Sequence, residues 1–557
     1  MGILLSVTGM RARALARLLK TTVIAFISLA MFACGRARPG PNTPASGPQS
    51  GILRFAEIDE PDGLNPLIAS EPNALEFSYF LYSFFFEVND KSELVPDVAL
   101  QVPTIANGGI SKDGRTITYH LRRNVRWEDG APLTARDVVF TYQAIMNPRN
   151  NIQGRFGYDK IAGVEAPDAY TVVVHMRTVD SAIVTLFMCL DGDYPILPAH
   201  LLAKYPDINH VAFNDKPVGS GPYRVAEWVR GDHLTLDANL SYWRGPPGLD
   251  KIEIFFVRDG NEIIDRLRAG TVDAWFRADP TAYPSLSQIP DIRVAISPDN
   301  NFGHLDFNLH DPLLQDVRVR KAIEMAIDRR RIVRDVTSYV YQTTDSDQPF
   351  TSWAYARSVP HVSYDRKGAT ALLQSAGWRR GADGVLENGS GRLSLQLAYL
   401  KGSVLDQQIA DILKSELAAV GIELIETPLA SDTFLASKQA GGKVYNGKYQ
   451  LAMFSWGVGI DPDDSWLYAC NQQPPAGENS MFWCDPNVDA AEADALGTFD
   501  VRRRASDYAI IQNEIADQVP MVFLYAQRRA DAYSTHFSGF APAPTFAYWD
   551  SYRWQMF

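Results

Sequence analysis

The residues that most directly suggest chemistry are three carboxylates, Asp461, Asp463 and Asp464, in the segment SWGVGIDPDDSWLY. Closely spaced carboxylates are typical of calcium-binding loops. An EF-hand loop that began at Asp461 would need glycine at its sixth position and glutamate at its twelfth. The chain has Trp466 and Gln472 there, so we expect no metal site. A helix start at the Asp-Pro pair explains the same acids, because carboxylates favour a helix N-terminus.

The same segment is better suited to contact with a ligand. Its strand ends in Trp-Gly-Val-Gly, and glycine lets the backbone approach a bound molecule because no side chain obstructs it. Two tryptophans could offer aromatic rings to that molecule. We therefore expect ligand contacts from Trp456, Gly457, Val458, Asp461 and Trp466.

Patterns typical of hydrolases are absent from the sequence. Ser220 lies directly between two glycines in PVGSGPY, whereas a nucleophile elbow has the form G-x-S-x-G. No HExxH motif and no isolated carboxylate pair occurs either. We expect no catalytic residue and no cofactor, which leaves a secreted hydrolase as the weakest alternative function.

The N-terminus has the composition of an export signal. Residues 1–33 place four basic residues before an apolar run that is too short to span a bilayer comfortably. The run ends in Ala-Cys-Gly, as in a bacterial lipobox, although Met31 stands where leucine is usual. We expect acylation of Cys34, with residues 34–51 as a flexible tether rich in Pro, Gly and Ser. A plain signal peptide with an incidental cysteine is the alternative.

The other three cysteines divide by their surroundings. Cys470 and Cys484 bracket a loop rich in proline, glycine and asparagine. In an exported protein a disulfide that closes this loop is favoured over a metal site. Cys189 stands alone in an apolar stretch and is predicted to be a buried thiol.

The length of the chain predicts its domain number, and its net charge excludes one class of function. A chain of 557 residues is too long for one compact core and predicts two or three domains. The formal net charge of −12 argues against a nucleic-acid-binding surface, which would need a basic face. After the N-terminal segment, no stretch is long and apolar enough to cross a membrane.

A strand–loop–helix unit at residues 301–333 organises the second half of the chain. Leu305, Phe307 and Leu309 alternate with polar residues, which predicts a half-buried strand. Asp316 is placed to cap a helix whose apolar stripe continues to residue 333. The unit is either an ordinary piece of an α/β domain or the point at which the chain crosses from one lobe into another.

Two further units predict a mixed α/β sheet. Strands at residues 393–400 and 422–426 flank a helix at residues 406–420, with Gly421 as its C-cap. Earlier in the chain, Thr134 and Asp137 form a variant of the capping box at the start of another helix.

These segments resemble, in order and spacing, the bacterial extracellular solute-binding proteins of the peptide and nickel class, family 5. The most specific match is residues 113–142, where a strand, Trp-Glu-Asp-Gly, a proline, a capped helix and Val-Phe-Thr-Tyr follow one another. LDFN, VRVRKAIEMAIDR and the GSGPY turn add to it, and the resemblance extends over residues 52–554.

The resemblance implies an α/β fold of the type II periplasmic-binding-protein class, with two lobes around a central cleft. Lobe I would comprise residues 52–88, 214–305 and 520–557, with an extra subdomain at residues 89–213. Lobe II would comprise residues 306–519. By position in this family, Glu60, Asn65 and Tyr525 are further candidates for ligand contact.

The implied function is that of the substrate-binding lipoprotein of an ABC importer. It would capture a peptide or similar polar solute between closing lobes and deliver it to membrane permease subunits. The resemblance implies an exported monomer, in the periplasm or at the cell surface, anchored by its N-terminal lipid and without a nucleic-acid partner. An oligosaccharide-binding or signalling module without peptide transport is the alternative.

One departure from the family concerns the ligand. Peptide-binding members use an Asp in the loop after the first tryptophan to pair with the peptide ammonium, but Gly457 to Ile460 carries no charge here. A buried ammonium without a partner costs several kcal/mol. We therefore expect weak binding of free dipeptides, unless Glu60 substitutes by projecting into the cleft.

Overall fold

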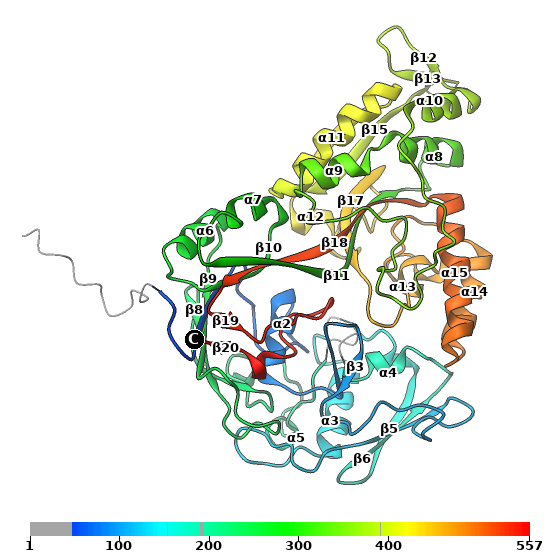
Figure 1. Cartoon of the computed structure of the whole chain (residues 1–557). Coiled ribbons are helices and arrows are strands. Elements are labelled where there is room, and N and C mark those ends of the chain that lie inside the picture. Colours follow the sequence, from blue (N-terminus) through cyan, green and yellow to red (C-terminus); the bar gives the residue numbers. More distant parts are fainter. Residues whose placement is uncertain (1–46, 153, 190–193, 390) are drawn as a thin grey trace, which may run out of the picture. The chain divides into compact units, whose positions relative to one another are not determined.

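One ten-stranded mixed sheet runs through the protein (Figure 1). The computed structural model describes residues 47–152, 154–189, 194–389 and 391–557. The strands of this sheet, in spatial order, are β16 (Glu423–Leu429), β15 (Ser394–Leu400), β17 (Leu451–Gly457), β11 (Ile292–Phe307), β18 (Met521–Ser534), β10 (Ala274–Ala278), β1 (Ile52–Glu57), β9 (Lys251–Phe256), β8 (His233–Ala238) and β7 (Tyr223–Val229).

The two longest strands, β11 with 16 residues and β18 with 14, join the two halves of this sheet. They pair antiparallel from Ile292 opposite Ser534 to Asp306 opposite Met521, and Figure 1 shows them side by side through the middle of the molecule. Lobe II lies on the β17 side and lobe I on the β10 side. The pairing is irregular after Pro298 and again after Gly303, so both lobes meet at a point where the ladder is locally disrupted.

Lobe I is built on β1, which pairs in parallel with β9 and β10. A separate three-stranded sheet, β4 (Thr116–His120), β6 (Thr171–Met176) and β5 (Ile161–Asp168), packs against α3 (Ala135–Met146). The predicted capping box is present at the start of α3, where the Thr134 backbone N–H donates to Asp137 Oδ2 at 2.8 Å. The hairpin of β2 (Phe86–Val88) and β3 (Leu94–Pro96) completes this part.

Lobe II contains the predicted β–α–β unit. Strands β15 and β16 are parallel and α11 (Val404–Val420) connects them. Gly421 ends α11 in the left-handed conformation, with φ of 93°, which glycine adopts without strain. On α11 itself, the side chains of Ile409, Leu413 and Leu417 are fully buried.

The helix expected to run from Asp316 to residue 333 is two helices. Asp316 caps α8 (Val317–Ala326), as predicted. A second cap then follows, because the Asp328 side chain accepts a hydrogen bond from the Arg331 N–H at the start of α9 (Arg329–Asp335). An aspartate that bonds to the backbone ahead of it ends one helix and begins the next, even though the apolar periodicity continues.

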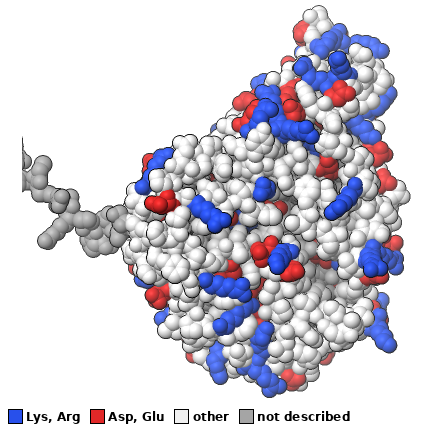
Figure 2. Space-filling model, in the orientation of Figure 1, with Lys and Arg blue, Asp and Glu red and all other residues white. Residues whose placement is uncertain are grey.

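The remaining α-helices belong to both lobes. They are α2 (Pro72–Leu81), α4 (Ile183–Leu186), α5 (Ala199–Leu202), α6 (Gly260–Arg268), α7 (Tyr283–Leu286), α10 (Arg366–Ser375), α12 (Ser431–Phe434), α13 (Ser465–Tyr468), α14 (Pro486–Leu496) and α15 (Val501–Gln518). Within the described ranges, none of the helices has the length and apolarity needed to cross a bilayer. On the face in Figure 2, acidic and basic side chains are interspersed.

Candidate functional site

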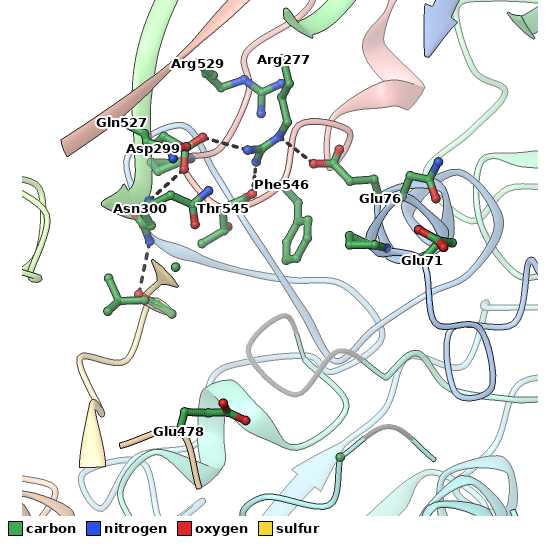
Figure 3. Close-up of a pocket in the computed structure, with 18 of the residues that line it drawn as sticks. Glu71, Glu76, Arg277, Asp299, Asn300, Glu478, Gln527, Arg529, Thr545 and Phe546 are labelled. Atoms are coloured by element: carbon green, nitrogen blue, oxygen red, sulfur yellow. Dashed lines mark hydrogen bonds and ion pairs between the residues drawn. The ribbon is translucent and has the colours of Figure 1, made fainter. Parts of the chain in front are cut away.

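A cavity of about 1510 Å³ lies between the lobes. Its walls come from α2 and β10 of lobe I, from the loop after β17 in lobe II, from the crossing strands β11 and β18, and from the C-terminal segment at residues 544–548. Figure 3 shows the polar side chains that project from these elements. A ligand held there would touch both lobes and both crossings at once.

Arg277 is the central cation of this cavity. Its backbone has a φ of 48° at an irregularity in the pairing of β10 with β18. A non-glycine residue in this region carries strain, and such a bulge redirects a side chain. The guanidinium lies between two carboxylates, with Nε 2.8 Å from Glu76 Oε1 and Nη1 2.8 Å from Asp299 Oδ2. Burial alone would lower the pKa of Arg277, but the negative charges of Asp299 and Glu76 raise it above its ordinary value.

The irregular part of β11 supplies two further polar groups. Asp299 Oδ1 accepts a hydrogen bond from the Asn301 N–H at 3.0 Å, in addition to its ion pair with Arg277. Asn300 donates from Nδ2 to the Gly459 carbonyl at 3.2 Å. This bond ties a crossing strand to the loop after β17 that the sequence singled out.

Strand β18 contributes a buried ion pair beneath the cavity. Arg529 donates to Asp531 at 2.7 and 2.8 Å, and neither side chain is exposed to solvent. Two parallel hydrogen bonds of this kind fix a guanidinium in both position and orientation. Because Arg529 also lines the cavity, its position defines one part of the floor.

Glu57, at the end of β1, lines the cavity, and its pKa is shifted. The Tyr548 hydroxyl donates to Glu57 Oε1 at 2.9 Å. Burial, and then the negative charge of Glu76, raise the pKa of Glu57 to about 8. At neutral pH this carboxyl group is therefore mainly protonated, and a cation placed beside it would favour release of that proton.

The loop after β17 forms the lobe II wall. Asp461 is held by Arg504, which donates at 2.7 Å from Nη1 to Asp461 Oδ2. Burial, and then the negative charge of Asp180 on lobe I, raise the pKa of Asp463 to about 6. The Trp466 indole N–H donates to the Asp463 carbonyl at 3.1 Å, so this ring is fixed against the loop.

Of the residues predicted for this site, Gly457, Val458, Asp461 and Trp466 line the cavity. Trp456 does not line it but lies edge-on to Trp466, with the ring centroids 5.2 Å apart. The Tyr525 ring stacks at 5.0 Å on Tyr341, a residue that does line the cavity. These two predicted residues therefore support the lining rather than belong to it.

Glu60 and Asn65 lie outside the cavity lining. Glu60 accepts hydrogen bonds from the Trp228 indole N–H at 3.0 Å and from the Gly231 N–H at 2.9 Å. Asn65 donates to Asn214 at 2.9 Å, beside a smaller cavity of about 440 Å³. Glu60 therefore does not substitute for the carboxylate that residues 457–460 lack. Carboxylates elsewhere in the lining could still pair with a ligand ammonium, and the weak binding of free dipeptides stays a prediction.

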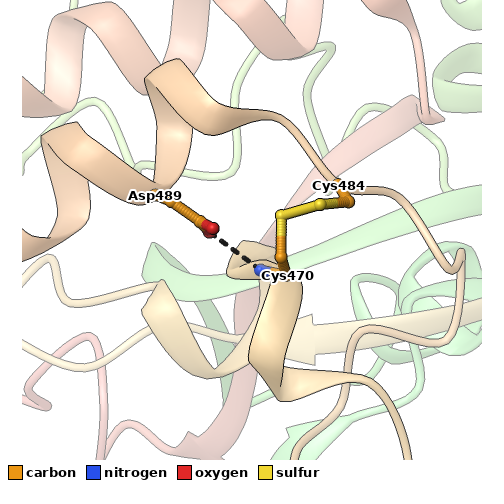
Figure 4. A group of neighbouring side chains, drawn as sticks. All are labelled: Cys470, Cys484 and Asp489. Atoms are coloured by element: carbon orange, nitrogen blue, oxygen red, sulfur yellow. Dashed lines mark hydrogen bonds between the residues drawn. A yellow bond between two sulfur atoms is a disulfide. The ribbon is translucent and has the colours of Figure 1, made fainter.

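The structure describes three of the four cysteines, and these three agree with the predictions. Cys470 and Cys484 form a disulfide, and Asp489 Oδ1 accepts a hydrogen bond from the Cys470 N–H at 2.8 Å (Figure 4). These three side chains lie close together, but disulfide sulfurs offer no thiolate to a metal ion. Cys189 is buried. Cys34, predicted to carry the lipid, lies outside the described residues.

A polar cluster that was not among the predicted site residues lines the cavity. It is formed by Glu76, Arg277, Asp299, Asn300 and Arg529. One signal for part of it exists. Arg529 and Asp531 are two residues apart in the strand, which places both on one face of the sheet. Charged residues on a buried strand face indicate either an internal ion pair or a polar site.

The comparisons with known proteins agree with this architecture. Residues 93–478 match the family model of bacterial extracellular solute-binding proteins, family 5, middle region. The chain belongs to this family. The predicted family, two-lobed α/β fold and substrate-binding role in ABC import are thereby confirmed.

Two curated relatives and two solved structures illustrate the similarity. The chain is 26% identical to the oligopeptide-binding protein AppA of Bacillus subtilis, over 91% of this chain and 92% of that protein. It is 24% identical to the dipeptide-binding protein of Escherichia coli, over 86% and 90% of the two chains. The structure of B. subtilis AppA with a nonapeptide matches at 24% identity, with a TM-score of 0.77 and coverage of 92% of this chain and 100% of that chain.

The second solved structure shows that the same fold serves different ligands. NikZ from Campylobacter jejuni, in complex with Ni(L-His), matches at 24% identity with a TM-score of 0.77, covering 91% of this chain and 100% of that chain. At this identity the two structures show the fold alone. The ligand of this family member has to be argued from its own cavity.

Proposed function

We propose that this solute-binding protein is a lipid-anchored, monomeric receptor that captures a peptide between its lobes and delivers it to the permease of an ABC importer. The observation that carries the proposal is the cavity itself. Its volume of about 1510 Å³ exceeds the roughly 300–1,000 Å³ of pockets for drug-sized molecules, so it has room for several amino-acid residues.

The chemistry of the lining supports an extended polar ligand. Gly457 and Gly459 bring backbone groups to the wall of the cavity, where they can bond to the amide groups of a peptide. Aromatic rings at Trp466, Phe546 and Phe156 lie among the charged groups and can pack against side chains. Closure would be stabilised by a ligand that touches both lobes, because such contacts exist only in the closed form.

Native mass spectrometry of protein purified from its own cells tests the proposal by identifying what co-purifies. We expect a distribution of masses that fragment as peptides. Calorimetry with a panel of penta- to nonapeptides and neutral oligosaccharides then measures affinity. Tight binding of an oligosaccharide, with no binding of any peptide in the panel, would overturn the proposal in favour of a glycan-binding protein.

A further inference from the structure

We infer, resting on the proposed peptide-binding function, that the cavity selects cationic ligands, with Glu478 as an acceptor for a positively charged ligand group. Acidic side chains outnumber cationic ones among the described residues that line the cavity. Ten of these side chains are carboxylic acids and five are cationic. The acids are Glu57, Asp59, Glu71, Glu76, Asp159, Asp279, Asp299, Asp461, Asp463 and Glu478.

Most of the cationic groups already have partners within the protein. Arg277 and Arg529 form the ion pairs described above. Lys160 Nζ lies 2.6 Å from Asp180 Oδ2, and Arg155 donates to three backbone carbonyls, the shortest of these bonds being 2.7 Å to Ile145. Among the described residues only Arg528 lines the cavity without such a partner, so it can donate hydrogen bonds to a single ligand carboxylate.

The carboxyl groups are mostly not neutralised in this way. Glu76 and Asp299 share Arg277, and Asp461 pairs with Arg504. No ion pair within the described ranges reaches the other seven. They are Glu57, Asp59, Glu71, Asp159, Asp279, Asp463 and Glu478. Glu57 is mainly protonated at neutral pH, so opposite charge on a ligand would relieve the repulsion among the other six, which lie around one space between low-dielectric walls.

The unpaired buried atoms point to the same ligand chemistry. Asn300 is 6% exposed and its Oδ1 has no hydrogen-bond donor, although its Nδ2 is bound to Gly459. Glu76 Oε2, Asn73 Oδ1 and Glu478 Oε2 are likewise buried without a donor, whereas Arg529 Nη1 is an unpaired donor. A buried acceptor without a partner is unfavourable. A ligand that donates N–H groups to these acceptors would therefore be stabilised in the cavity.

Glu478 is the acceptor that is best placed to choose between ligands. It lies on the loop between Cys470 and Cys484, and its own N–H donates to the Trp466 carbonyl at 3.0 Å. Burial, and then the negative charge of Glu478, raise the pKa of the Tyr445 hydroxyl. Figure 3 shows Glu478 across the cavity from the cluster around Arg277, so a cation there would not approach that arginine.

Calorimetry with the pentapeptides Ala-Ala-X-Ala-Ala, where X is lysine, norleucine or glutamate, tests the inference. Lysine and norleucine differ in the terminal charge, so their affinity ratio isolates the electrostatic part. We expect the lysine peptide to bind about tenfold more tightly than the norleucine peptide, and the glutamate peptide to bind most weakly. The ratio should shrink as the salt concentration rises.

Glu478→Gln keeps the shape of the side chain and removes its charge. We expect it to reduce the lysine-to-norleucine ratio severalfold, whereas the control Glu387→Gln, an exposed residue on β13 (Leu386–Asn388) outside the cavity, should leave the ratio unchanged. Equal binding of the three peptides, or tightest binding of the glutamate peptide, would overturn cation selectivity while leaving peptide capture intact.

A ligand that is not a peptide separates the two proposals. Spermidine carries amines but no amide groups, and citrate carries carboxylates. If no peptide binds but spermidine raises the unfolding temperature and citrate does not, the cation preference holds and peptide capture fails. If neither a peptide nor spermidine binds, the inference is overturned.

Discussion

Arg277 and Asp299 form an ion pair of 2.8 Å that joins β10 of lobe I to the irregular segment of the crossing strand β11. Both residues stand where a strand departs from regular pairing, Arg277 with a positive φ and Asp299 just after Pro298. The pair therefore holds together two segments with irregular pairing, and Glu76 on α2 adds a second carboxylate to it.

Replacing Arg277 by methionine should destabilise the protein by about 2 kcal/mol, between the values for an exposed and a fully buried ion pair, because its side chain is 30% exposed. Methionine keeps much of the side-chain length but leaves the carboxylates of Glu76 and Asp299 without a counter-ion. The matched control is Arg268→Met, which removes an exposed pair with Asp265 and should cost less than 1 kcal/mol. Urea unfolding measures both. A loss for Arg277→Met no larger than for the control would contradict the role given to this pair.

Glu57→Gln should change how stability depends on pH. The pKa of Glu57 is raised to about 8 in the folded state but is ordinary, about 4.5, in the unfolded chain. Between these values the folded protein binds a proton that the unfolded chain has released, so the stability of the natural protein falls as pH rises. Glutamine imitates the protonated form and can still accept the hydrogen bond from Tyr548.

The variant should therefore gain stability relative to the natural protein as pH rises from about 4.5 to about 8, with a constant difference outside this window. Denaturant unfolding at several pH values measures this difference. Other carboxyl groups with a raised pKa contribute equally to both proteins, so their contributions cancel. Glu76, Tyr548, Arg277 and Arg529 are the charged or titratable groups that act on Glu57, and all four are retained. Parallel stability curves for the two proteins would rule out the raised pKa.

The parts of the fold that could be predicted depend on residues close together in sequence. The capping box of Thr134 and Asp137 lies within four residues, and Gly421 needs only its own freedom to adopt a positive φ. The break before α9 also has a local cause at Asp328, but the apolar periodicity that continued past it concealed the boundary.

The polar cluster of the cavity could not be predicted in this way. Glu76, Arg277 and Asp299 come from three segments that are far apart in the sequence. The direction of the Arg277 side chain also depends on a bulge in β10 for which the sequence has no recognisable pattern. Glu60 was proposed from its position alone, and its side chain is taken up by hydrogen bonds from Trp228 and Gly231 near the β7–β8 turn. Gly457 and Trp466 were found because a local pattern marked their loop.

Cys34→Ser should release the protein from the membrane. The prediction follows from the short apolar run that ends in Ala-Cys-Gly, since only a cysteine can accept the lipid through its sulfur. Fractionation of cells that produce the natural protein or the variant measures the distribution, with Cys189→Ser as the control for loss of a thiol. A variant that stays in the membrane fraction would show that Cys34 is not the anchor.

Loss of the Cys470–Cys484 disulfide should lower both the stability of the protein and its selectivity for cationic ligands. The bond closes a loop with a sequence separation of 14 residues, and cross-linking a loop of about this size stabilises by about 3 kcal/mol in the chain-entropy model. The same loop carries Glu478 into the cavity, so its freedom in the double variant Cys470→Ser/Cys484→Ser should also reduce the preference for the lysine peptide. Urea unfolding and the pentapeptide series measure the two effects separately. Alkylation of both thiols in the unreduced protein, unfolded in guanidinium, would show that the bond is not formed.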